Sequence, residues 1–272
     1  MLLIPRLGWI DMKKVTFNER DMMLRVGFFV FVIALWHFSV TLLDISPLVF
    51  PAPWGVVVSL YQGIASGEFL FHTGVTLYET LMGFVIGAIV ALVLGGLIGQ
   101  IRLLEKIFYP YIVAFQAMPK VAVAPLFVAW FGFGVTSKII ITATIVFFPI
   151  LANTIVGLRS APREQIEMMA AFTASPWQKF LMVRFPHALP YIFAGLDVGI
   201  VLAIIGAIVG EFVGAQAGLG YLILQRNFSM DITGVFAILI VLSAIGIGLH
   251  TIMKFIAKRT VFWSETSEDL RQ

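Results

Sequence analysis

The sequence predicts an all-α protein that crosses a membrane six times. Hydrophobic residues make up 60% of the 272 positions and charged residues only 12%, about half the charged fraction of an average soluble domain. The chain also contains apolar runs long enough to cross a hydrocarbon layer about 30 Å thick. It has no cysteine, so a disulfide framework and a thiolate metal site are both excluded.

Six apolar runs are interpreted as transmembrane helices. They cover residues 26–43, 76–98, 107–131, 139–156, 190–212 and 232–253. Residues 1–25 mix apolar and charged positions, so we expect a cytoplasmic interfacial segment there. The transmembrane domain then extends over residues 26–253, and residues 254–272 form a cytoplasmic tail.

The distribution of Lys and Arg predicts the orientation. If both termini are inside, the cytoplasmic segments are 1–25, 101–106, 157–187 and 254–272, and they hold 15 of the 18 basic residues. Lys138 and Arg226 then fall in outer loops, and Lys120 falls in the third apolar run. Because short cytoplasmic segments are enriched in Lys and Arg, we predict this orientation for a multi-pass membrane protein.

Small residues recur in the second apolar run. They occupy every fourth position, at Gly83, Gly87, Ala91, Gly95 and Gly99. A spacing of four keeps them on one stripe of a helix, where a neighbouring backbone can approach closely. The sequence does not identify the neighbouring helix.

The third run is expected to contain a broken helix. Lys120 directly follows Pro119, and a broken helix within a membrane must be buried in protein or line a watery cavity. Lys120 either packs against backbone carbonyls or an acid such as Asp197 or Glu211, or lines a pathway for an anionic substrate. The candidate pathway residues are therefore Pro119, Lys120, Asp197 and Glu211.

The third cytoplasmic segment predicts two short helices. The first covers residues 162–172, and the second begins at Pro176 after an N-cap at Ser175. Ser175 and Gln178 have the spacing of a capping box, in which each side chain bonds to the backbone of the other residue. We expect the second helix to end before Pro186, because proline disfavours a helical conformation in the residue before it.

This segment resembles the EAA loop of ABC-importer permeases, whose pattern is E-A-A, three residues, G, nine residues, then I-x-L-P. The matching positions are Glu167, Met168, Met169, Thr173, Val183 and Pro186. All spacings are kept, but Thr173 stands where the family has a glycine. Glycine would allow a left-handed turn between the two helices, and such a turn costs a β-branched residue more.

Other parts of the chain resemble the nitrate, sulfonate and taurine subfamily of these permeases. The similar stretches are residues 50–53, 119–127, 130–134, 188–196, 210–211 and 218–221. The resemblance covers residues 47–263 in order and at family spacing. Asp197 is a departure, because the subfamily commonly has arginine there.

The resemblance implies a type I ABC-importer permease fold, a place in the bacterial inner membrane and a set of partners. Segment 157–187 would couple the chain to a dimer of ABC ATPases, through Glu167, Met168, Met169, Thr173, Ser175, Pro176, Val183 and Pro186. The subfamily also implies a second, identical permease copy and an external solute-binding protein. ATP and Mg would be bound by the ATPase, so no cofactor is expected in this chain, which has no GxxxxGK[ST] phosphate-binding loop.

The resemblance implies a small anionic solute, of the sulfonate, taurine, nitrate or aromatic-acid class. A pyrimidine-type or flavin-type vitamin precursor is the alternative. A second alternative is an ion-coupled secondary transporter, which would need paired ionisable residues in mid-membrane; by position only Lys120 and Asp197 qualify. The chain has no HExxH or GxSxG motif and its four histidines are widely separated, so neither an enzyme nor a metal site is expected, and no nucleic-acid partner.

Overall fold

The computed structural model describes residues 19–263, and within this range all regular secondary structure is helical. The elements are α1 (Glu19–Leu42), α2 (Pro53–Ala65), α3 (Glu68–Gln100), α4 (Arg102–Ala117), α5 (Lys120–Phe131), α6 (Val135–Arg159), α7 (Arg163–Ala171), α8 (Pro176–Lys179), a π-helical turn η1 (Phe180–Arg184), α9 (Phe185–Gly214), α10 (Leu219–Phe228) and α11 (Ile232–Thr260). The all-α fold class is confirmed.

Five helical stretches of the described range are long and apolar enough to cross a membrane. They are Met22–Leu42 of α1, α3, α6, the continuous stretch Pro176–Gly214, and α11. The pair α4 and α5 supplies a sixth if it counts as one span, with a bend of 93° between its halves. The six apolar runs of the sequence therefore correspond to five helices and one bent pair.

The bend between α4 and α5 occurs at Met118 and Pro119. Met118 has an extended backbone with ψ 134°, as expected for a residue that precedes proline. Pro119 is itself the N-cap of α5 and lacks the N–H that would continue α4. The predicted break in the third run is confirmed.

The centre of the molecule is a three-helix packing of α3, α6 and α9. The predicted stripe of small residues on α3 faces α6: a Cβ added at Gly87 would lie 2.6 Å from the Ala143 carbonyl oxygen. The helix α9 also packs closely on α6, because a Cβ added at Gly206 of α9 would lie 2.8 Å from the Thr142 Cα. Backbones this close leave room only for hydrogen at these positions. The neighbour of the α3 stripe is thus in the same chain.

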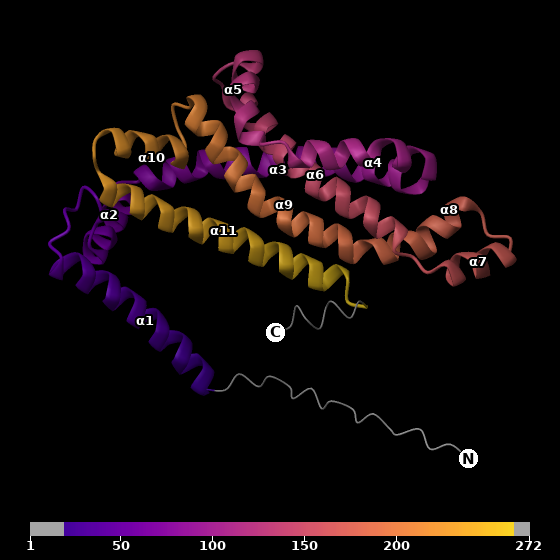
Figure 1. Cartoon of the computed structure of the whole chain (residues 1–272), viewed down its shortest axis with the longest axis horizontal. Helices are drawn as coiled ribbons and strands as arrows, with labels where there is room; N and C mark the ends of the chain where they lie inside the picture. The colour runs from indigo at the N-terminus through magenta and orange to yellow at the C-terminus, as the bar shows by residue number, and fades with distance from the viewer. Residues whose placement is uncertain (1–18, 264–272) are drawn as a thin grey trace.

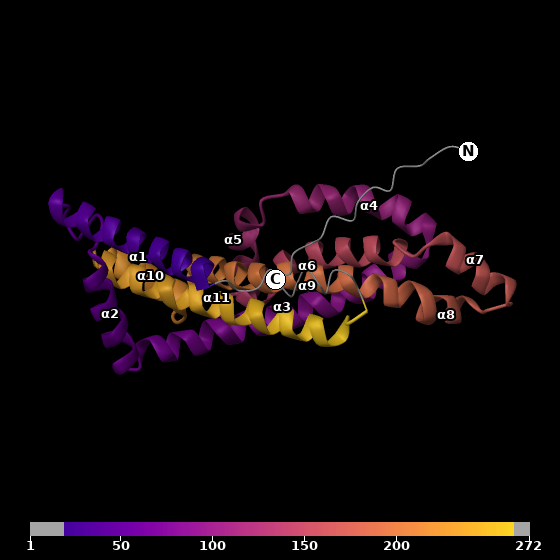
Figure 2. The same ribbon diagram turned by 90° about the horizontal axis from the view of Figure 1, so that it is seen from below.

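The molecule is elongated, and its two ends differ. Figure 1 and Figure 2 show α7 and α8 together at one end and α2 and α10 at the other. In Figure 1, the N-terminal part of α1 diverges from the neighbouring α11. Trp36 connects the other half of α1 to the bundle, because its Nε1 donates to the Pro51 carbonyl at 3.0 Å and its ring lies 6.0 Å from that of Phe236.

Several helices lie outside the six apolar runs or extend beyond them. The helices α2 and α10 lie in segments that we interpreted as outer loops. The last helix runs to Thr260, past the last apolar run that ends at residue 253, because Met253 and Ala257 continue its buried face and the basic Lys258 and Arg259 suit the last turn. Within the expected interfacial segment 1–25, α1 begins at Glu19; residues 1–18 and the tail residues 264–272 lie outside the described residues.

Candidate functional site

The segment between α6 and α9 contains the two short helices that the sequence predicts. The first, α7, ends in a left-handed turn at Thr173, whose φ is 55°. The Thr173 N–H donates to the Ala170 carbonyl at 2.9 Å, and the Ala174 N–H donates to the Met169 carbonyl at 3.0 Å. This pair of bonds is a Schellman motif, which usually has glycine at the left-handed position. Thr173 therefore adopts the turn that the family glycine would allow.

The second short helix begins with the predicted capping box. The Gln178 N–H donates to Ser175 Oγ at 3.2 Å, and the Ser175 N–H donates to Gln178 Oε1 at 2.8 Å. Pro176 occupies the first helical position, where its missing N–H costs no hydrogen bond. The sequence alone was sufficient to predict this helix start, because all the bonds are local.

Large apolar side chains of this segment face solvent. Met168, Phe172 and Trp177 are 54%, 77% and 62% exposed. Met169 is half-buried, whereas Val183 is buried and anchors the segment to the bundle. Glu167 lies on α7 and is exposed. A helical corner with several exposed apolar residues and an acidic group is suited to docking on another protein.

The second short helix does not end before Pro186, so that prediction is wrong. It continues through η1 into α9, and Pro186 lies in the first turn of α9. The Phe185 N–H bonds to the Phe180 carbonyl, five residues back. This π-type turn re-pairs the backbone around the proline, so the helix can continue.

The candidate pathway residues do not come together. Lys120 Nζ donates to the Gln116 carbonyl at 3.1 Å and lies 5.3 Å from the centroid of the Phe148 ring. No ion pair among residues 19–263 joins Lys120 to Asp197 or Glu211. Lys120 therefore contacts a backbone carbonyl and an aromatic ring at the helix break.

The two candidate acids have separate partners. Asp197 Oδ1 lies 2.6 Å from His250 Nδ1, which joins α9 to α11. Glu211 is buried and accepts hydrogen bonds from Thr76 Oγ1 at 2.7 Å and from the Gly220 N–H at 2.5 Å. Glu211 thus holds the start of α10 and the N-terminal third of α3 against α9.

Comparison with known proteins identifies the chain. The family described as "Binding-protein-dependent transport system inner membrane component" matches residues 83–262. The chain belongs to this family. The permease is 40% identical over 231 residues to the riboflavin transport system permease protein RibX of Chloroflexus aurantiacus, covering 85% of this chain and 86% of that protein. It is 30% identical to the putative aliphatic sulfonates transport permease protein SsuC of Bacillus subtilis, covering 87% and 86%.

A third relative and a solved structure agree with this assignment. The permease is 34% identical to the formylaminopyrimidine transport permease protein ThiX of Halalkalibacterium halodurans, covering 81% of this chain and 87% of that one. Its fold matches a chain of the MetNI methionine ABC transporter in an inward-facing conformation, with a TM-score of 0.56. That match covers 77% of the permease and 98% of the other chain at 21% identity. The type I importer permease fold is confirmed.

The permease also contains buried charged residues that sequence reasoning missed. Lys138, which we expected in an outer loop, is buried in α6, and Nζ donates to the carbonyls of Phe133 at 2.5 Å and Gly214 at 2.7 Å. Its charged neighbours are Glu79 of α3 and Glu211 of α9. Glu79 is also buried, and one of its carboxylate oxygens has no hydrogen-bond partner among the described residues.

A sequence signal for this cluster was present. Glu79 lies inside the predicted second span, and an ionisable residue within a membrane span needs a partner or a function. Lys138 lies one residue before the predicted fourth span, so a small error in that boundary moved it from the core to a loop. The cluster joins all three central helices of the permease.

Proposed function

We propose that this permease works as a homodimer with a dimer of ABC ATPases and an external binding protein, and forms the pathway by which a solute enters the cell. The observation that carries this proposal is the exposed helical corner from α7 to η1. This corner presents an acidic residue, Glu167, together with apolar side chains that are exposed to solvent within residues 19–263. The distribution of Lys and Arg supports a cytoplasmic position for this corner, where the ATPases would be.

The structure also supports a way for ATPase movement to reach the membrane. From Pro176 to Gly214 the chain is one helical stretch of 39 residues, which runs from the exposed corner into the three-helix centre. A helix of this length transmits a displacement better than two helices with a flexible joint. The continuation through Pro186 therefore favours mechanical coupling between the corner and the core.

For the solute, two classes have support. Lys120 supplies a cation at a helix break, which suits a small anion such as a sulfonate. A flavin-type or pyrimidine-type vitamin precursor is favoured by the names of two relatives, a riboflavin permease and a formylaminopyrimidine permease. Aromatic rings also accompany Lys120, since Phe115 stacks on Phe148 with 5.9 Å between centroids, and a planar ring system could stack there.

The coupling proposal is tested by reversing the charge of Glu167. We expect Glu167→Lys to lower ATPase co-purification and to lower transport and binding-protein-stimulated ATP hydrolysis together. Glu164→Lys is the matched control, because Glu164 is an exposed acid in the first turn of the same helix. If both variants assemble, transport and hydrolyse ATP normally, the corner is not the ATPase contact. Uptake into ATP-loaded vesicles, with and without an ion gradient, separates this function from a secondary transporter.

The solute class is tested by competition. Uptake through the reconstituted complex would be challenged with alkanesulfonates, riboflavin and formylaminopyrimidine in turn. Competition by a sulfonate supports the anionic class, and competition by riboflavin or the pyrimidine supports the alternative. The ligand that co-purifies with the cognate binding protein gives an independent answer.

A further inference from the structure

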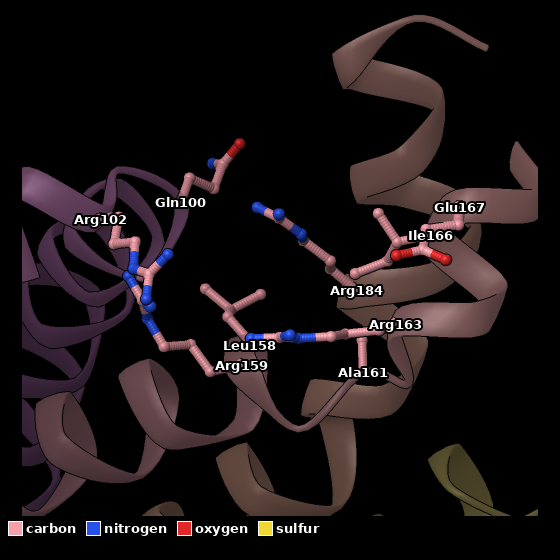
Figure 3. A pocket seen from close by; sticks show the side chains of 10 residues that line it. Gln100, Arg102, Leu158, Arg159, Ala161, Arg163, Ile166, Glu167 and Arg184 are labelled. Carbon is pink, nitrogen blue, oxygen red and sulfur yellow. The ribbon is translucent and has the colours of Figure 1, made fainter. Parts of the chain in front are cut away.

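A cavity of about 530 Å³ lies between the ends of the transmembrane helices and α7. Four arginines line it, namely Arg102, Arg159, Arg163 and Arg184. Figure 3 shows Arg102 and Arg159 close together on one side, with Arg163 and Arg184 extending toward them from the other. The cavity is therefore surrounded by guanidinium groups from four separate elements.

Three of the four arginines have no ion pair with an acid of the described range. Arg159 pairs with Glu105 at 2.5 Å, and no ion pair between residues 19 and 263 involves the other three. Glu167 is the acidic side chain that lines this cavity. Like charges around one space repel each other unless an anion lies between them. The charge balance therefore favours a bound anion.

The backbone adds to this preference. Arg102 is the first residue of α4 and Arg163 is the first residue of α7. The unpaired N–H groups and the dipole at a helix N-terminus favour anions. Two such termini, from helices of 16 and 9 residues, adjoin the cavity.

We propose that this cavity binds a phosphate group, carried by an acidic phospholipid or by a soluble phosphate compound. Arginine guanidinium groups bind phosphate oxygens in a two-pronged geometry, which several arginines around one space can satisfy together. A basic pocket between transmembrane helices, at the membrane face where Lys and Arg concentrate, is also a typical site for acidic lipid head groups. The bound group would tie Arg163 of α7 to Arg102 of α4 and Arg159 of α6, and so brace the exposed corner.

The test uses the full-length permease with its ATPase in phosphatidylcholine nanodiscs. One arm adds phosphatidylglycerol to the bilayer, and the other titrates inorganic phosphate against chloride at constant ionic strength. Bound lipid is measured by native mass spectrometry, and the melting temperature is measured in both arms. The variant Arg163→Gln/Arg184→Gln removes two cations that line the cavity. The matched control, Lys254→Gln/Lys258→Gln, removes two cations near the C-terminal end of α11, which does not line the cavity.

We expect the wild type and the control to gain melting temperature in at least one arm, and the cavity variant to bind about tenfold or more weakly. A gain with phosphatidylglycerol alone identifies a lipid, and a gain with inorganic phosphate identifies a soluble ligand. No gain in either arm, or an equal loss in both variants, overturns the proposal. If the cavity variant loses only the ATPase, the arginines contact a protein instead, and the proposal is also wrong. Because bound lipid and the phosphate-dependent melting temperature are measured independently of transport and ATP hydrolysis, failure of this proposal is distinguishable from failure of the ATPase contact at Glu167.

Discussion

Two adjacent glycines of α3 should respond oppositely to the same substitution. A Cβ added at Gly95 would lie 2.8 Å from the Thr154 side chain of α6, whereas a Cβ added at Gly96 meets no atom within 4 Å. Both residues are in the interior of a regular helix of 33 residues. Replacing each by alanine therefore changes helix propensity equally and changes packing only at Gly95.

The expected difference follows from these two effects. Alanine in place of glycine stabilises a helix interior by about 0.8–1 kcal/mol. At Gly95 the added methyl also forces α3 and α6 apart, and overpacking of a tight core typically costs about 1–3 kcal/mol. We expect Gly96→Ala to be neutral or stabilising and Gly95→Ala to be destabilising, with a difference of about 1–3 kcal/mol between their free energies of unfolding.

The measurement is equilibrium unfolding in mixed detergent micelles, monitored by tryptophan fluorescence and repeated by thermal aggregation of the purified permease. The two variants should separate in both assays, and Gly95→Val should be worse than Gly95→Ala. Equal stability of Gly95→Ala and Gly96→Ala would refute the close α3–α6 contact in the functional state.

The remaining predictions concern single side chains. Thr173→Gly should raise the free energy of unfolding by less than about 1 kcal/mol, because relief of the left-handed strain slightly exceeds the entropic cost of glycine; destabilisation of that size would mean that Thr173 is helical in solution. Lys138→Met should destabilise by about 3–5 kcal/mol, because Glu79 and Glu211 would keep buried carboxyl groups without their cation; normal yield and melting temperature would contradict this. Lys120→Met should abolish uptake and leave assembly and basal ATP hydrolysis intact, and normal uptake would exclude a pathway role.

Local interactions were predictable because they depend on near neighbours in the chain. The capping box at Ser175 and Gln178 needs only residues three apart, and the break before Pro119 follows from a steric clash between adjacent residues. The family spacing marked Thr173 as the position of a left-handed turn and left open whether a threonine adopts it; in the structure, local backbone bonds stabilise the turn. Membrane insertion was also predictable, because it depends on whether the length of each apolar run matches the thickness of the hydrocarbon core, and not on contact with a particular partner helix.

Contacts between distant segments required the tertiary structure. The course of the chain at Pro186 depends on how a π-type turn re-pairs its backbone and on Val183 packing into the bundle, so the local rule for proline gave the wrong helix end. The four arginines around the cavity are separated by up to 82 positions. They meet only because the start of α4, the end of α6, the start of α7 and the end of η1 lie together. The sequence by itself determined the fold class, the six apolar runs and the start of α8, because these follow from composition and from bonds within one turn. Only the tertiary structure decided which charged groups share a buried or enclosed space, because that depends on how the helices pack against one another.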